Sequence, residues 1–83
     1  MKILYFAWLR TKIGCAEEEI ELPDTVKTVA DVLEHLRSKG GAYADCLSAD
    51  KVIRVALNQD YAKDDDAVKA TDEFAIFPPV TGG

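Results

Sequence analysis

Hydrophobic residues fall into short segments along the chain, and their spacing predicts strands around one helix. Residues 2–10 (KILYFAWLR) combine β-branched and aromatic side chains over the length of a strand, and Gly14 follows as a turn signal. We expect this segment to form the first strand. In residues 18–22 apolar residues alternate with glutamates, and Pro23 follows. This period of two is typical of a half-buried strand, so we expect a hairpin partner that ends at Pro23.

Residues 28–40 carry the pattern of a helix. Thr28 is a suitable N-cap residue, and Asp31 stands where a capping box has its acidic side chain. Apolar residues then recur at helical spacing at Val29, Val32, Leu33 and Leu36. We expect this face to pack on the sheet and the helix to end at Gly40, because glycine readily adopts the left-handed conformation of a helix end. His35 lies off the apolar stripe and is interpreted as a surface residue.

The second half of the chain predicts one helical turn, at residues 42–47, and more strands. The strands are expected at residues 52–57 (VIRVAL), 61–63 and 73–77 (EFAIF). Pro78 and Pro79 end the last one, because proline donates no backbone hydrogen bond. This order of elements is that of an α+β, ubiquitin-like β-grasp fold. The first and last strands would pair in parallel at the centre of a mixed sheet, since the helix supplies the crossover that parallel neighbours need.

Length and composition limit the classes of protein to consider. A chain of 83 residues has room for one domain, which we place at residues 1–77, with a flexible tail at 78–83. The hydrophobic content of 48% predicts a folded chain. The net charge of −5 argues against a nucleic-acid partner, because phosphate binding needs clustered cations. The longest apolar run, at residues 3–9, is far shorter than the about 20 residues of a membrane helix. We expect a cytoplasmic protein that does not bind membranes.

The cysteines and the histidine predict no metal site. Cys15 and Cys46 are far apart in sequence, and a single histidine cannot complete a zinc site with them. We expect both thiols to be reduced and to act as small hydrophobic side chains.

The C-terminal residues 78–83 (PPVTGG) carry the most specific signal. Glycine has no Cβ, so Gly82 and Gly83 make the chain thin enough to enter a narrow channel and present the terminal carboxylate to an active site. Extended, these six residues span about 20 Å. A carboxylate is a poor electrophile, so the chemistry implied is activation by ATP to an acyl-adenylate, from which a sulfur donor displaces AMP.

The first strand predicts a surface for a protein partner. Alternation along residues 2–10 places apolar side chains on both faces of the sheet. We therefore expect Phe6, Phe77 and Tyr61 to form an exposed apolar patch. The alternative is that loops of the chain itself cover this face. Arg10, at the end of the predicted strand, would suit a contact with a partner carboxylate.

The segments KILYFAWLR, VALNQ and above all FAIFPPVTGG resemble the small subunits of molybdopterin synthases, and the likeness spans nearly the whole chain. In that family the small subunit is a sulfur carrier and donates sulfur without being the catalytic subunit. The resemblance implies that Gly83 is adenylated by a ubiquitin-activating-type enzyme, which uses ATP, and that a sulfur donor protein then converts it to a thiocarboxylate. The tail would deliver this sulfur to cyclic pyranopterin monophosphate in the large catalytic subunit, within a heterotetramer. No tightly bound cofactor is implied.

The resemblance also assigns roles to individual positions. Gly83 would be the covalent carrier, with Thr81 and Gly82 inside the channel of the large subunit. The docking patch would consist of Phe6, Tyr61 and Phe77, and Arg10 would contact the adenylating enzyme. Tyr61 stands where a smaller aliphatic residue is expected. Three alternatives stay open: a sulfur carrier for another pathway, such as thiamine or a tungsten-pterin variant; a ubiquitin-like modifier of lysines; and a non-covalent interaction domain.

Overall fold

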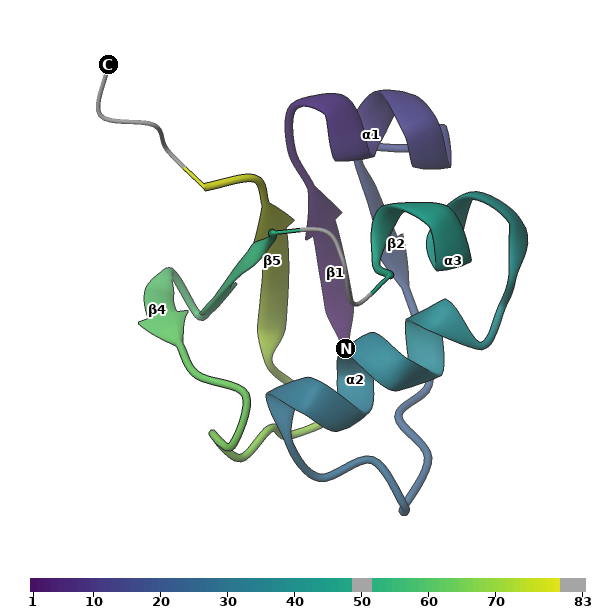
Figure 1. Cartoon of the computed structure of the whole chain (residues 1–83). Coiled ribbons are helices and arrows are strands. Elements are labelled where there is room, and N and C mark those ends of the chain that lie inside the picture. The colour runs from purple at the N-terminus through teal and green to yellow at the C-terminus, as the bar shows by residue number, and fades with distance from the viewer. Residues whose placement is uncertain (49–51, 80–83) are drawn as a thin grey trace.

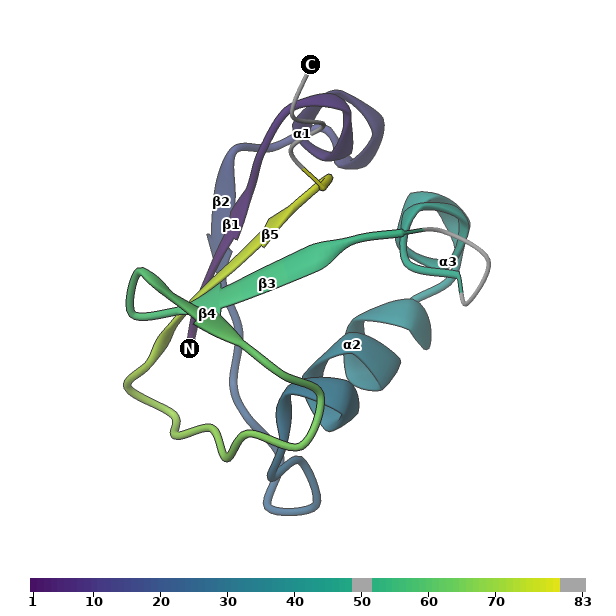
Figure 2. The same ribbon diagram turned by 60° about the vertical axis from the view of Figure 1, so that its left-hand side comes forward.

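The fold is one mixed sheet with helices on one side. The computed structural model describes residues 1–48 and 52–79. Its elements are β1 (Lys2–Tyr5), α1 (Trp8–Ile13), β2 (Glu17–Glu19), α2 (Val29–Arg37), α3 (Gly41–Cys46), β3 (Arg54–Leu57), β4 (Asp60–Ala62) and β5 (Glu73–Phe77). The strands follow the order β2-β1-β5-β3-β4. Helix α2 crosses the sheet in Figure 1, and Figure 2 shows α2 and α3 together on one side of it.

The central pair of strands confirms the predicted topology. β1 and β5 run parallel, in register from Lys2 beside Glu73 to Tyr5 beside Ile76. β2 pairs antiparallel with β1, and β3 pairs antiparallel with both β5 and β4. The ubiquitin-like β-grasp predicted from the sequence is therefore the observed fold.

The predicted first strand was wrong beyond Tyr5, where the chain turns into α1. Ala7 precedes this helix with φ 55° and ψ −133°, a conformation that breaks the extended path. In the helix, Leu9 and Ile13 lie one turn apart and pack toward the core, Leu9 fully buried. Gly14 closes the helix in the left-handed conformation, and its N–H donates to the Arg10 carbonyl at 2.9 Å. The apolar run therefore divides at Ala7: Phe6 stays exposed ahead of the helix, and Leu9 is the buried residue of α1.

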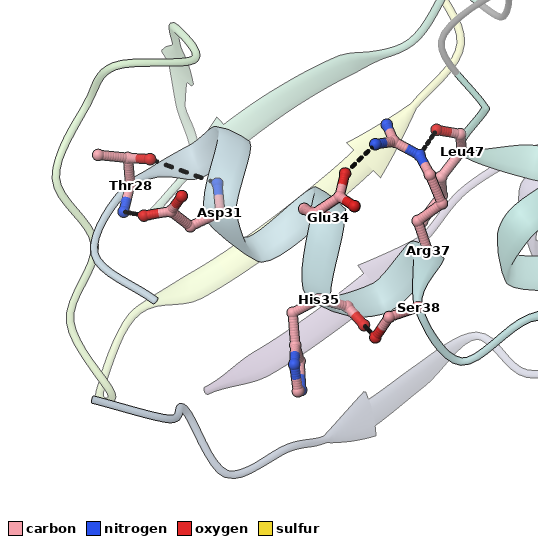
Figure 3. Close-up of polar contacts among 7 residues, drawn as sticks. All are labelled: Thr28, Asp31, Glu34, His35, Arg37, Ser38 and Leu47. Atoms are coloured by element: carbon pink, nitrogen blue, oxygen red, sulfur yellow. Dashed lines mark hydrogen bonds and ion pairs between the residues drawn. The ribbon is translucent and has the colours of Figure 1, made fainter. Parts of the chain in front are cut away.

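The capping box at the start of α2 is confirmed (Figure 3). The Asp31 N–H donates to Thr28 Oγ1 at 3.3 Å, and the Thr28 N–H donates to Asp31 Oδ2 at 3.2 Å. The expected end at Gly40 was wrong, because the helix ends at Arg37. Gly40 has a positive φ of 76°, but its ψ of −168° is not that of a left-handed helix end, and the residue serves as the N-cap of α3 instead.

The core lies between α2 and the inner face of the sheet. Its fully buried side chains include Ile3, Tyr5, Leu9, Val29, Val32, Leu36, Leu47, Phe74 and Ile76. Cys15 and Cys46 form no disulfide; Cys46 is buried and Cys15 half-buried. The strands at 18–22 and 52–57 are shorter than predicted, covering Glu17–Glu19 and Arg54–Leu57. The apolar residues just outside them, such as Ile20 and Ile53, still pack against the core, which explains their pattern without strand geometry.

Candidate functional site

The face of the sheet opposite α2 carries a row of apolar residues across four strands. The register pairs Leu4 with Ala75, Ala75 with Ala56, and Ala56 with Tyr61. Directly paired residues point to the same side of a sheet, and their neighbours along each strand, such as Ile3 and Phe74, fill the core on the other side. The row therefore lies on the outer face.

A second row follows at the end of the sheet where β5 finishes. The Phe6 N–H donates to the Ile76 carbonyl at 3.2 Å, which places Phe6 beside Phe77, and Phe77 pairs with Arg54 of β3. The rings of Tyr61 and Phe77 are in contact, with centroids 5.9 Å apart. We call the apolar members of both rows the outer patch: Leu4, Phe6, Ala56, Tyr61, Ala75 and Phe77.

The outer patch is open in the part of the chain that the structure describes. The side chains of Phe6 and Tyr61 are 48% and 79% exposed. Between Leu4, Phe6, Ala56 and Phe77 lies a shallow hollow of about 480 Å³, whose rim includes Pro78. The three patch residues predicted from the sequence therefore lie together. The alternative, that loops of the chain cover this face, does not hold for the described residues.

The root of the tail leaves directly from the outer patch. Pro79 borders a second hollow of about 350 Å³ together with Arg54, Tyr61 and Phe77. The predicted channel residues Thr81 and Gly82 and the predicted carrier Gly83 lie outside the described residues. The described part of the tail is Pro78 and Pro79, which border the hollows of the outer face.

Arg10 occupies a different element from the one predicted. It lies on α1, exposed, rather than at the end of a strand. Its helix stands at the same end of the molecule as the C-terminal end of β5 (Figure 1). The sequence reasoning missed Leu4, Ala56 and Ala75 as patch members, although the alternation within each strand is the signal that assigns them to the outer face.

A polar cluster joins β2 to the helices, away from the outer patch. The Glu18 carboxylate accepts hydrogen bonds from the Tyr43 hydroxyl at 2.7 Å and from Lys39 Nζ at 3.4 Å, and the Cys15 thiol lies at 3.6 Å. Partial burial opposes ionisation of Glu18, but the Tyr43 hydrogen bond and the Lys39 charge outweigh it and lower the pKa of this carboxyl.

The same cluster leaves Cys15 unsuited to nucleophilic chemistry. Burial and the neighbouring Glu18 raise the pKa of the Cys15 thiol, which keeps it protonated at neutral pH. Burial and the bond to Glu18 likewise raise the pKa of Tyr43 to about 12. This arrangement is typical of a structural link between elements, in which Glu18 stays ionised at neutral pH while Cys15 and Tyr43 stay protonated.

The described residues also bear on metals and membranes. Across 1–48 and 52–79, no three His, Cys, Asp or Glu side chains are grouped as ligands of a metal ion would be. His35 is half-buried on α2, and its backbone carbonyl accepts the Ser38 hydroxyl at 2.6 Å (Figure 3). Within the same ranges, the helices are too short and too polar to cross a bilayer.

Comparisons with known proteins agree with this geometry. A model of the ThiS family matches residues 3–83. The molybdopterin synthase sulfur carrier subunit of Haemophilus influenzae is 43% identical over 83 residues, which cover 100% of this chain and 99% of that protein. The subunit of the same name from Escherichia coli is 32% identical, with the same coverage. Among solved structures, SAMP1 from Haloferax volcanii is similar at a TM-score of 0.77, with 31% identity, covering 100% of this chain and 98% of that one.

Proposed function

This chain belongs to the ThiS family, and we infer that it is the sulfur carrier subunit of a molybdopterin synthase. The observation that carries the inference is the full-length similarity to sulfur carrier subunits of that enzyme, which runs through the final Gly82 and Gly83. The outer patch supports it, because a carrier must offer its partner an uncovered docking surface beside the tail.

The reactive group of the carrier is the carboxylate of Gly83. One of its oxygens attacks the α-phosphorus of ATP in the adenylating enzyme, and pyrophosphate leaves. A donor protein supplies sulfur at the oxidation level of sulfide, and this HS⁻ nucleophile then attacks the carbonyl carbon. The new C–S bond forms as the C–O bond to AMP breaks, which leaves a thiocarboxylate. In the large catalytic subunit this sulfur forms a bond to cyclic pyranopterin monophosphate. Water then attacks the carbonyl carbon of Gly83, the C–S bond breaks with the sulfur left on the pterin, and the carrier returns with an ordinary carboxylate.

The carrier's own residues contribute binding and positioning. The outer patch provides apolar area that is removed from water when a partner docks, and Tyr61 and Phe77 provide rigid aromatic contacts. Pro78 and Pro79 hold the start of the tail at fixed φ, so less conformational entropy is lost when the tail is threaded. Gly82 and Gly83 give it the small cross-section that a channel requires.

Intact-mass spectrometry tests this function. The protein is incubated with its adenylating enzyme, ATP and a sulfur source, and we expect a mass increase equal to the exchange of one oxygen atom for sulfur. Two controls are a variant lacking Gly83 and a variant with one alanine added after Gly83. Both should fold and neither should deliver sulfur to the pterin. An unchanged mass of the wild-type chain with an enzyme of proven activity would refute the proposal.

One rival function has an observation in its favour. The similar Haloferax volcanii protein is titled small archaeal modifier protein 1 in a second solved structure, at 29% identity and a TM-score of 0.77. A modifier would form isopeptide bonds between Gly83 and lysines of other proteins. Conjugates that form in cells and survive boiling of the cell extract with reductant would favour this function. A carrier for thiamine synthesis, in contrast, would transfer sulfur without the large synthase subunit.

A further inference from the structure

The two ends of the outer patch carry opposite charge. At the tail end, Arg54 pairs with Phe77 and therefore lies on the outer face, next to the hollow that Tyr61 and Pro79 border. Its side chain is exposed, and in the described part of the chain it makes no ion pair. Among the described residues, Arg54 therefore gives the tail end of the patch a positive charge without an ion-pair partner.

The far end of the patch is acidic. There the register places Lys2 between Glu19 and Glu73, and Glu17 lies beside Leu4 on the same outer face. Lys2 Nζ forms an ion pair with Glu17 at 3.0 Å. The N-terminal ammonium of Met1 also lies 3.7 Å from the Glu19 carboxylate. Two cations among three carboxylates leave a net negative charge at this end, and Glu73, which also borders the hollow of the outer patch, forms no ion pair with a described residue. The apolar surface thus separates an acidic rim from a basic one.

This polarity bears on how a partner can dock. Apolar contact has little directional preference, so a smooth patch of small and aromatic side chains by itself permits several orientations. Only one of them points the tail into a catalytic channel. Charges at the rim of an interface affect orientation and association rate more than affinity, and mismatched charges penalise the wrong orientations.

We propose that Arg54 and the opposing carboxylates Glu17, Glu19 and Glu73 orient the large synthase subunit on the outer patch. This inference rests on the proposed function. The large subunit would present a carboxylate against Arg54, at the mouth of the channel that receives the tail, and basic side chains against the acidic rim. We assign the surface to the large subunit because the similar proteins are named as subunits of the synthase.

Charge reversal at each rim tests the inference in binding measurements with the purified large subunit. We expect Arg54→Glu and Glu73→Lys each to raise the dissociation constant about tenfold at low salt, mainly through slower association. Added salt should shrink the difference, because Arg54, Glu17 and Glu19 are solvent-exposed and Glu73 is only half-buried. Two matched controls, Lys27→Glu and Asp24→Lys, make the same charge changes at exposed sites in the loop before α2 and should stay within about twofold of wild type.

The outcomes separate this inference from the proposed function. If wild-type protein takes up sulfur and binds the large subunit, but the rim variants behave like the controls, the inference is overturned while the function stands. If wild type neither binds nor takes up sulfur, both fail. Thermal unfolding of each variant checks the fold, and Glu73→Gln, which keeps the shape of the side chain, replaces Glu73→Lys if that variant unfolds. A smaller loss of the same sign for Glu73→Gln would support the inference.

Discussion

Some surface residues of this protein are expected to contribute to partner binding but little to the stability of the fold, and Tyr61 is one of them. Tyr61 is the most exposed of the large hydrophobic side chains in the described chain, and its ring contacts that of Phe77. An exposed aromatic ring in a monomer contributes little to folding, but it is a frequent anchor at interfaces.

We therefore predict that Tyr61→Ala weakens binding to the large subunit about tenfold and changes the free energy of unfolding by less than about 0.5 kcal/mol. Val52→Ala is the matched control, because Val52 is also exposed, at 64%, but lies outside the outer patch. Titration calorimetry and urea unfolding measure the two quantities. Equal affinities for wild type and Tyr61→Ala would remove Tyr61 from the docking surface.

Ala7, in contrast, is expected to affect the stability of the fold, through its backbone conformation. Its φ of 55° and ψ of −133° belong to a region that residues with a Cβ avoid, at a cost of order 1–3 kcal/mol. Glycine adopts this conformation without strain but costs about 0.5–1 kcal/mol more in lost chain entropy. The strain is the larger quantity.

We predict that Ala7→Gly stabilises the fold by about 1 kcal/mol, measured by urea unfolding. Ala30→Gly is the matched control. Ala30 is exposed inside α2, where glycine should destabilise by about 1 kcal/mol. The same sign of change in both variants would show that Ala7 is not strained.

At the scale of elements, the helix and the last strand were predictable because one periodic pattern determined each of them. The stripe of α2 and its capping box are local in sequence, and they survive in the structure with small changes at the end. β5 is a short apolar run, EFAIF, that ends at a pair of prolines. The topology followed from the order of elements alone.

The start of α1 was not predictable in the same way. Residues 6–10 contain aromatic and apolar side chains that suit a strand, and no glycine marks the sharp turn at Ala7. Only the tertiary burial of Leu9 selects the helix. The patch residues Phe6 and Phe77 were predicted from the sequence. The charged rim was not, because it depends on strand register, which pairs Arg54 with Phe77 although the two residues are far apart in sequence.

Elements are also joined by the polar cluster around Glu18. The pKa of Glu18 is lowered in the folded state, chiefly because hydrogen bonds and the Lys39 charge outweigh the opposing effect of burial. A carboxyl with a depressed pKa stabilises the fold above its unfolded pKa of about 4.3, and this contribution is lost as the pH falls through the folded value.

We predict that Glu18→Gln lowers the melting temperature at pH 7 and that the difference from wild type narrows below about pH 4.3. Glu21→Gln is the control, because Glu21 is exposed and its side chain forms no ion pair or hydrogen bond with the helices in the described chain. Thermal melts between neutral and acidic pH provide the measurement. A difference that stays constant across this range would show that ionised Glu18 is not what holds β2 to α3.

At the scale of the whole molecule, the buried core that stabilises the fold lies on one face of the sheet, and the proposed docking surface and reactive tail belong to the opposite face. The core fills the side covered by α2, while the outer patch and the root of the tail occupy the opposite side. A carrier that meets two partners in turn benefits from this separation, because docking and release leave the core untouched. The docking area must also stay small enough for the spent carrier to leave.

This separation predicts the effect of ending the chain at Phe77. Pro78 and Pro79 are half-buried and border the outer hollows, so their loss should lower the melting temperature by less than about 4 °C, the shift that about 0.5 kcal/mol produces in a domain of this size. Sulfur uptake should be abolished. A variant lacking Gly83 alone should lose sulfur uptake with no change in melting temperature. A large drop in melting temperature for the shorter chain would contradict this separation. It would show that the tail is part of the folded domain and stabilises the core as well as carrying the sulfur.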